Sequence, residues 1–295
     1  MATIRSSFPR YGWIGLALIA WQEITVICYH FGAAPQQFWF EAAGWTTPAC
    51  WWGYILAVDA HLFHRRGESL IQNRRGIFWL QCILSFAFWT WFEGYNVLLD
   101  GWKYENLPDY MPIRFAGYII AFATIMPGMF ETTELIQSWG WFDRWKCTPP
   151  REGRIPDAWL NLSIALGAAF CFVPAFLGRE TGSYLWAFVW CGWVFLLDPI
   201  NYRRGGPSIF GDWARGDWSR FSQLMCAGLV CGFLWEFWNI WATAKWIYNF
   251  PMLRSWKIFE MPVAGFLGFP PFNVEYFVMF HFIALFLTKE DKLRL

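Results

Sequence analysis

Residues 221–247 read FSQLMCAGLVCGFLWEFWNIWATAKWI, an apolar run that contains a single acid, Glu236. A helix of about 20 apolar residues spans the hydrocarbon core of a bilayer, so this run predicts a transmembrane helix. Further runs of the same kind occur at 11–31, 44–63, 77–99, 112–137, 157–178, 184–201 and 261–287. The sequence therefore predicts an all-α fold, a polytopic membrane helix bundle of about eight transmembrane helices.

The composition excludes an ordinary soluble protein. Hydrophobic residues make up 57% of the 295 residues and charged residues only 15%, whereas a soluble domain carries about 25% charged residues. A net charge of +1 provides no basic surface for nucleic acid, so we expect no nucleic-acid partner. We expect an integral membrane protein, located in a bacterial cytoplasmic membrane.

The distribution of basic residues predicts the orientation. When the N-terminus is placed in the cytoplasm, all but six of the 23 Lys and Arg residues fall in cytoplasmic segments, as the positive-inside rule requires. The six exceptions are Lys103, Arg114, Arg179, Lys245, Arg254 and Lys257. An even number of helices then places both termini in the cytoplasm.

Three patterns occur twice, in the same order. The first combines a glycine, an aspartate, an Arg-Arg-Gly loop and a serine, at Gly53, Asp59, Arg65 and Ser69 and again at Gly192, Asp198, Arg203 and Ser208. The second joins Glu-x-x-Asn to Trp-x-Tyr, at Glu93, Asn96, Trp102 and Tyr104 and again at Glu236, Asn239, Trp246 and Tyr248. The third is Pro-x-x-x-Glu, ending at Glu131 and at Glu275. Residues 1–150 and 151–295 are therefore predicted to be four-helix repeats, parallel because each contains an even number of helices.

Four of the repeated residues are acids within apolar runs, namely Glu93, Glu131, Glu236 and Glu275. An acid at the bilayer centre costs about 2.5–3.5 kcal/mol on insertion scales, so such acids face a cavity or a partner. We interpret the four as catalytic, because a buried protonated acid suits general-acid chemistry on an apolar substrate. The alternative is that they lock the bundle by interhelical hydrogen bonds.

Polar and aromatic residues near these acids are candidates for substrate binding. Asn96 and Asn239 lie three residues after a glutamate, on the same helix face. Trp91, Trp235 and Trp238 flank the two Glu-x-x-Asn pairs. Their rings suit a pocket for a long polyene, or the stabilisation of a carbocation. The alternative is that these tryptophan side chains face the lipid and bind no substrate.

Asp59 and Asp198 have a structural interpretation beside the catalytic one. Each lies about a turn and a half before its Arg-Arg-Gly loop. Because intramembrane acids commonly pair locally, we expect ion pairs with Arg65 and Arg203.

Motifs for metals and cofactors are absent from the sequence. The eight Cys residues form no Cys-x-x-Cys, and the four His residues form no His-x-x-x-His pair. Phosphate-binding glycine motifs are also missing. We therefore expect neither a metal nor a cofactor.

The stretch 233–280 resembles the small membrane-embedded lycopene cyclase family. That family has a Trp-acid pair, an aromatic-x-aromatic-Asn turn and a helix with Gly-x-Pro-x-Glu-Glu-x-x-Phe-Phe. The counterparts are Trp235-Glu236, Trp246-Ile247-Tyr248-Asn249 and Pro271 through Glu275. Val274 replaces the first acid of the family's Glu-Glu, the Pro-to-Glu spacing is longer, and the match covers about a third of the chain.

The resemblance implies an isoprenoid substrate and extends the candidate site. Tyr248 in the turn, with Tyr104 as its looser counterpart in the first half, joins the predicted substrate-binding residues. We expect an enzyme that acts on a carotenoid-like or other isoprenoid lipid by cyclase- or isomerase-type acid–base chemistry, with membrane lipid or isoprenoid as its partner. Two alternatives stay open, namely a non-catalytic subunit or scaffold that binds partner subunits in a larger membrane complex, and a transporter with central acids.

Overall fold

The computed structural model describes residues 6–149, 153–252 and 255–287, and within them the fold is all-α with two short antiparallel ribbons. The elements of the first half are α1 (Arg10–His30), α2 (Gln36–Ala43), α3 (Thr46–Arg66), α4 (Leu70–Asn73), α5 (Arg75–Leu99), β1 (Trp102–Glu105), α6 (Met111–Phe122) and α7 (Ile125–Ser138). Local sequence explains several boundaries. Pro9 precedes α1, and Gly67 ends α3 in the left-handed conformation that glycine adopts without strain.

The second half begins with α8 (Asp157–Phe176) and the short α9 (Gly178–Gly182), followed by a 3₁₀ turn at Ser183–Leu185. The remaining elements are α10 (Trp186–Arg203), α11 (Ile209–Ala214), α12 (Ser219–Trp241), β2 (Lys245–Tyr248), β3 (Lys257–Ile258), β4 (Met261–Pro262), a 3₁₀ segment at Val263–Gly268 and α13 (Phe269–Leu287). Ser208 caps α11, since its hydroxyl accepts the Gly211 N–H.

Six helical segments of the described chain are long and apolar enough to cross a membrane. They are Arg10–His30, Met111–Ser138, Asp157–Phe176, Gly178–Arg203, Ser219–Trp241 and Val263–Leu287. The molecule is therefore an integral membrane protein by the length and composition of its helices. The expected spans 44–63 and 77–99 form α3 and α5, which are 21 and 25 residues long but are not among the six.

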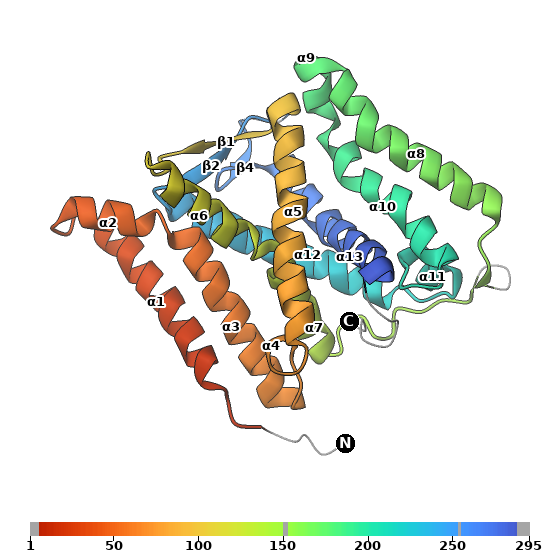
Figure 1. Cartoon of the computed structure of the whole chain (residues 1–295), viewed down its shortest axis with the longest axis horizontal. Coiled ribbons are helices and arrows are strands. Elements are labelled where there is room, and N and C mark those ends of the chain that lie inside the picture. The colour runs from red at the N-terminus through yellow and green to blue at the C-terminus, as the bar shows by residue number, and fades with distance from the viewer. Residues whose placement is uncertain (1–5, 150–152, 253–254, 288–295) are drawn as a thin grey trace.

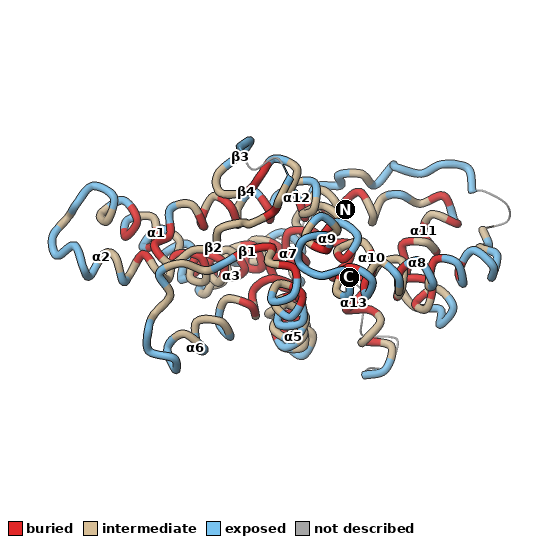
Figure 2. Tube along the Cα trace, turned by 90° about the horizontal axis from the view of Figure 1, so that it is seen from above, coloured by how far each residue is buried: buried red, intermediate tan, exposed pale blue. Residues whose placement is uncertain are grey.

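Two pairs of helices flank a central group. α1 lies along α3 on one side and α8 lies along α10 on the other, with α5, α7, α12 and α13 between them (Figure 1). Seen from above, the buried positions concentrate in the middle of an elongated molecule, and the outer helices carry many exposed ones (Figure 2). An exposed apolar helix surface is what a lipid-facing position requires.

Glycines allow the outer pairs to approach closely. A Cβ on Gly15 of α1 would lie 2.5 Å from the carbonyl oxygen of Gly53 on α3, and a Cβ on Gly192 of α10 would lie 2.7 Å from Cys171 Sγ on α8. Small residues at crossings let membrane helices gain van der Waals contact and backbone proximity. The two outer pairs are therefore set by backbone contact rather than by large side chains.

A side chain compensates for the break between α6 and α7. Ser85 of α5 donates its hydroxyl to the Phe122 carbonyl at 2.5 Å and accepts the Met126 N–H at 3.0 Å. Inside a bilayer the backbone groups freed by a helix break must find protein partners. Ser85 supplies both, so α6 can turn away from α7 at membrane depth.

The core joins the two halves through aromatic rings. Trp51 of α3 lies 4.8 Å from Trp235 of α12, and Phe92 of α5 lies 5.9 Å from Phe272 of α13, measured between ring centroids. All four side chains are buried. Such contacts stabilise beyond the burial of area alone, and they place α3, α5, α12 and α13 around one shared centre.

Candidate functional site

The ribbon formed by β1 and β2 connects the two halves at one end of the bundle. Its register pairs Trp102 with Tyr248 and Tyr104 with Trp246. Each Trp-x-Tyr sequence therefore lies antiparallel to its counterpart from the other half. Both aromatic residues of one strand stand opposite aromatic residues of the other.

The two asparagines anchor this ribbon. Asn96 accepts the Trp102 N–H at 2.9 Å and donates to the Trp102 carbonyl at 3.0 Å. Asn239 makes the same two bonds with Trp246, each at 2.9 Å. The amides that we expected to bind substrate thus hold the backbone that carries the indoles and phenols.

Glu93 lies behind the first strand of the ribbon. Its Oε1 accepts hydrogen bonds from Trp89 Nε1 and Trp102 Nε1, both at 3.0 Å, and from the Tyr104 hydroxyl at 2.5 Å. Asn96 donates to the other oxygen at 3.3 Å. Donors directed at a carboxylate stabilise its charged form.

Glu236 has an equivalent but sparser set of donors. Its Oε1 accepts the Tyr248 hydroxyl at 2.7 Å and Trp246 Nε1 at 3.3 Å. Its Oε2 is buried and has no hydrogen-bond partner among the described residues. A buried oxygen without a donor disfavours the carboxylate relative to the neutral acid. The two glutamates thus have similar neighbours and different degrees of charge stabilisation.

A cavity of about 540 Å³ lies on the other side of these aromatic residues. Trp102, Tyr104, Trp246 and Tyr248 all contribute to its wall, so each glutamate is separated from the cavity by one aromatic side chain that it hydrogen-bonds. Trp51, Trp89, Trp190, Trp235, Phe269 and Phe272 extend the apolar lining. The volume is typical of a small-molecule site.

The lining becomes polar where α2 and α6 approach the cavity. Gln37, Glu41, Asp109 and Arg114 line this part. Ile113 also lines it while remaining 45% exposed. The cavity thus reaches the outer surface of the molecule at α6.

The phenols on the wall stay neutral. Burial raises the pKa of Tyr104 and of Tyr248 well above the usual value, and the hydrogen bond that each phenol donates to its glutamate raises each pKa further. Both residues lie on the ribbon, outside the six candidate spans. They therefore retain their protons over the physiological pH range.

Glu131 and Glu275 are buried elsewhere and do not line the cavity. Glu131 lies within electrostatic range of Asp59, and Glu275 within range of Cys191. The carboxyl oxygens of both glutamates lack hydrogen-bond donors among the described residues. None of the four candidate acids lines the cavity, but Glu93 and Glu236 are hydrogen-bonded to phenols of its wall, whereas Glu131 and Glu275 have no such contact.

The three candidate tryptophans occupy three different environments. Trp235 lines the cavity. Trp91 is 51% exposed on the outer surface of α5. Trp238 is buried against Trp51, with 5.3 Å between ring centroids, and donates its Nε1–H to Glu23 at 3.2 Å.

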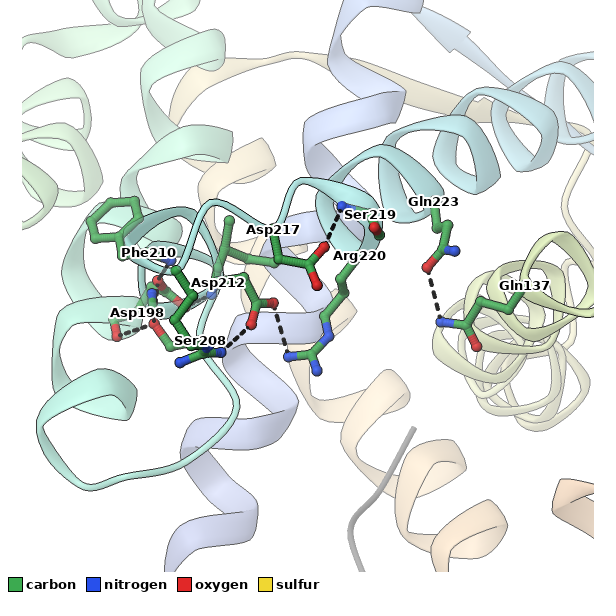
Figure 3. A network of polar contacts seen from close by, with 12 residues as sticks. Gln137, Asp198, Ser208, Phe210, Asp212, Asp217, Ser219, Arg220 and Gln223 are labelled. Carbon is green, nitrogen blue, oxygen red and sulfur yellow. Dashed lines mark hydrogen bonds and ion pairs between the residues drawn. The ribbon is translucent and has the colours of Figure 1, made fainter. Parts of the chain in front are cut away.

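The aspartates take other partners than the arginines that we expected. Asp198 accepts the Ser208 hydroxyl at 2.9 Å and the backbone N–H groups of Ile209 and Phe210 at 3.0 and 2.7 Å, at the start of α11 (Figure 3). Arg203 instead contacts Asp157 at 3.5 Å. A buried carboxylate is better satisfied by fixed N–H groups than by an arginine that reaches the surface.

Asp59 repeats this arrangement in the first half. It accepts the Ser69 hydroxyl at 2.9 Å, the Ile71 N–H at 2.7 Å and the Tyr11 hydroxyl at 2.5 Å. Arg65 points to the Ser138 hydroxyl, 3.4 Å away. Both aspartates hold the loop that follows their helix, so their role is local and structural.

The sequence interpretation missed most of the cavity wall. Trp102 belonged to a repeated Trp-x-Tyr sequence, and that repetition was the signal for a role beyond membrane anchoring. Trp190 and Phe269 carry no such signal, because they are two aromatic residues among many.

No protein family profile, curated protein or solved structure gives a significant match to this chain.

Proposed function

We propose that this protein is an integral membrane enzyme that isomerises or cyclises a carotenoid-like or other isoprenoid lipid by acid–base chemistry, as its resemblance to the lycopene cyclase family implies. The observation that carries the proposal is that the half-buried Glu93 and the buried Glu236 are each hydrogen-bonded to a phenol on the wall of one aromatic cavity. Neutral isoprenoids need a proton donor, a proton acceptor and a dry apolar site.

The architecture belongs to the proposal as well. We propose that α3 and α5 join the six candidate spans to give eight, in two parallel four-helix repeats at 1–150 and 151–295. The two asparagine–tryptophan bridges and the two aspartate–serine contacts support the repeat, because each occurs once per half. The basic residues favour cytoplasmic termini in a bacterial cytoplasmic membrane.

The proton donor in this scheme is Glu236 acting through Tyr248. The sparser donors around Glu236 favour its protonated form, and the Tyr248 hydroxyl lies 2.7 Å from its Oε1. In the proton-transfer step this hydrogen bond reverses, so that the carboxyl O–H donates to the phenol oxygen as the phenol proton goes to the substrate. Protonation of a terminal double bond yields a carbocation. Attack by a neighbouring double bond then closes a ring, and aromatic faces on the wall stabilise the positive charge.

The proton acceptor is Glu93 acting through Tyr104. Three donors on one oxygen favour its carboxylate. Loss of a proton from the cyclic cation to Tyr104, with transfer of the phenol proton to Glu93, completes an isomerisation with no net gain or loss of atoms. Such relays contribute about 10²–10⁴-fold to a rate.

Access from the lipid favours an enzyme over a transporter. Ile113, Phe115 and Ile119 of α6 are 45, 57 and 54% exposed, and the same helix lines the cavity. In a membrane such an apolar exposed face contacts lipid tails. A polyene longer than the cavity would insert one end from the side.

The test is expression in a bacterial host that accumulates a linear carotenoid, with pigments analysed by chromatography and mass spectrometry. We expect a cyclised or isomerised product, carrying one deuterium for each protonation step when membranes that contain the preformed linear carotenoid are incubated in D₂O. Glu236→Gln should lower product formation about 100-fold. Glu105→Gln is the matched control, because it removes an acid of the same ribbon that pairs with Lys103.

An unchanged pigment profile with well-folded wild type contradicts the proposal, as does a Glu236→Gln variant as active as wild type. Co-purification of stoichiometric partner subunits with an inactive wild type would instead indicate a scaffold.

Glu275→Gln tests whether Glu275 is catalytic, as the sequence predicts. Activity close to wild type would remove Glu275 from the mechanism.

A further inference from the structure

A second hollow, of about 460 Å³, lies where α8 begins and α10 ends. Arg154, Arg203 and Arg215 line it, together with Tyr202 and the loop glycines Gly205 and Gly206. It shares no lining residue with the aromatic cavity. Three guanidinium groups around one hollow attract an anion.

The carboxylates near this hollow leave part of its positive charge uncompensated. Arg203 pairs with the exposed Asp157, which also lines the hollow, at 3.5 Å, and donates to the neutral Asn161 side chain at 2.6 Å. Arg215 shares Asp212 with Arg220, at 2.5 and 3.2 Å (Figure 3). One buried carboxylate therefore serves two arginines.

Arg154 adds a further charge, and no described carboxylate contacts it. The Tyr202 hydroxyl accepts the Ile155 N–H at 3.3 Å. This bond does not use the hydroxyl proton, so the hydroxyl can donate it to another acceptor. The hollow thus combines three cations with a hydroxyl donor. Donors of this kind are suited to phosphoryl oxygens.

The first half has a counter-ion at a position where the second half has an apolar residue. Glu134, which is buried, contacts Arg74 at 2.5 Å and Arg66 at 3.7 Å. Glu134 follows Glu131 by three residues, and the residue that follows Glu275 by three is Val278. The arginines of the second half have Asp157 and Asp212 instead, and neither of these carboxylates contacts Arg154.

We infer that this hollow binds the phosphoryl group of an anionic phospholipid. Arg154 and Arg203 lie at the ends of the candidate spans Asp157–Phe176 and Gly178–Arg203, and Arg215 lies shortly before the span Ser219–Trp241. The ends of spans are at the depth of lipid head groups. Guanidinium groups bind phosphate oxygens in a two-pronged geometry. The inference is independent of the proposed catalytic function.

The experiment uses the full chain purified in detergent, with phosphatidylglycerol and phosphatidylcholine titrated separately and bound lipid counted by native mass spectrometry. We expect wild type to retain phosphatidylglycerol preferentially. Arg203→Gln should weaken this binding about tenfold, because it removes one charge-assisted contact. Arg204→Gln is the matched control, since Arg204 is the exposed neighbour that does not line the hollow.

A second arm adds inorganic phosphate as competitor. Retention of phosphatidylglycerol in excess phosphate supports the lipid assignment, and displacement by phosphate overturns it in favour of a free anion. Equal losses in Arg203→Gln and Arg204→Gln overturn the proposal, because they indicate diffuse attraction. If Arg203→Gln does not fold, Arg154→Gln provides the same comparison from a surface segment without described ion pairs.

Discussion

At the scale of single residues, the asparagines show how position changes the role of a side chain. Asn239 and Asn96 were candidates for substrate contact because each shares a helix face with a glutamate. In the structure each amide instead bridges both backbone groups of a ribbon tryptophan. The i, i+3 spacing indicated that the asparagine lies near the glutamate. Only the ribbon showed that the amide holds the tryptophan backbone.

The Asn239 bridge predicts a stability effect. Asn239→Ala leaves the Trp246 N–H and carbonyl without partners, so we expect a loss of about 2–4 kcal/mol in the free energy of unfolding. Asn161→Ala is the control, because Asn161 is exposed on α8 and accepts a single described bond, from Arg203. Chemical unfolding in detergent, followed by tryptophan fluorescence, measures both. Equal losses would disprove the anchoring role.

Tyr248 permits a test of the proton relay. Tyr248→Phe keeps the ring on the cavity wall and removes the hydroxyl, so product formation should fall about 100-fold. Tyr118→Phe is the comparison, because Tyr118 lines the same cavity but has no described hydrogen bond to either glutamate. A drop of the same size in both variants would argue against the relay.

The raised pKa of Tyr248 and Tyr104 determines the expected pH dependence. For an acid, a raised pKa extends the neutral form to higher pH, so neither phenol loses its proton near the usual value of about 10. Spectrophotometric titration should show the most exposed tyrosines ionising first and a late group of buried tyrosines, which includes Tyr104 and Tyr248, ionising only on denaturation. In the double variant Tyr104→Phe/Tyr248→Phe, fewer tyrosines should ionise in this late group. An unchanged late group would refute the assignment.

At the scale of elements, loops after α3 and α10 are held by aspartates. Asp198 satisfies two backbone N–H groups and a hydroxyl at the start of α11. The equal spacing of aspartate and serine in both halves identified these residues as parts of a repeat. It did not predict the partner, because the sequence places the arginines nearby as well.

Asp198→Ala should therefore destabilise the protein through its loop. Three buried donors lose their acceptor, and we expect a cost of about 3 kcal/mol or more. Asp109→Ala provides the control, since that carboxylate is fully exposed and its contact with Arg114 measures 3.9 Å. Thermal unfolding of the two variants in the same detergent compares them. A similar melting temperature for both would contradict the structural role.

At the scale of the whole molecule, the outer helices are attached through small residues. Gly15→Ala would place a Cβ 2.5 Å from the Gly53 carbonyl, so we expect a loss of about 1–3 kcal/mol as α1 and α3 separate. Gly94→Ala introduces a Cβ into open space on α5 and should stabilise the helix by about 0.5–1 kcal/mol. We expect the free energy of unfolding to decrease in Gly15→Ala and to increase in Gly94→Ala. Destabilisation by both would show that helix crossings are not the cause.

Much of the architecture could be predicted from the chain alone, because it depends on local composition. Long apolar runs predict membrane helices wherever they fall, and six candidate spans lie where such runs were expected. The repeated Trp-x-Tyr, Glu-x-x-Asn and Asp-to-Ser spacings identified residues that do meet in space. Hydropathy and spacing are properties of neighbouring residues, so the sequence contains them directly.

Tertiary structure decided which acids share a cavity. Glu93 and Glu236 come from helices far apart in sequence, and the ribbon joins them at one aromatic cavity. Glu131 and Glu275 carry the same sequence signal, yet their helices turn them away from it. The sequence by itself determined a membrane-embedded helical protein with repeated buried acids. Only the packing of α5, α12 and the ribbon decided where chemistry can take place, because a cavity is made by surfaces that long-range contacts bring together.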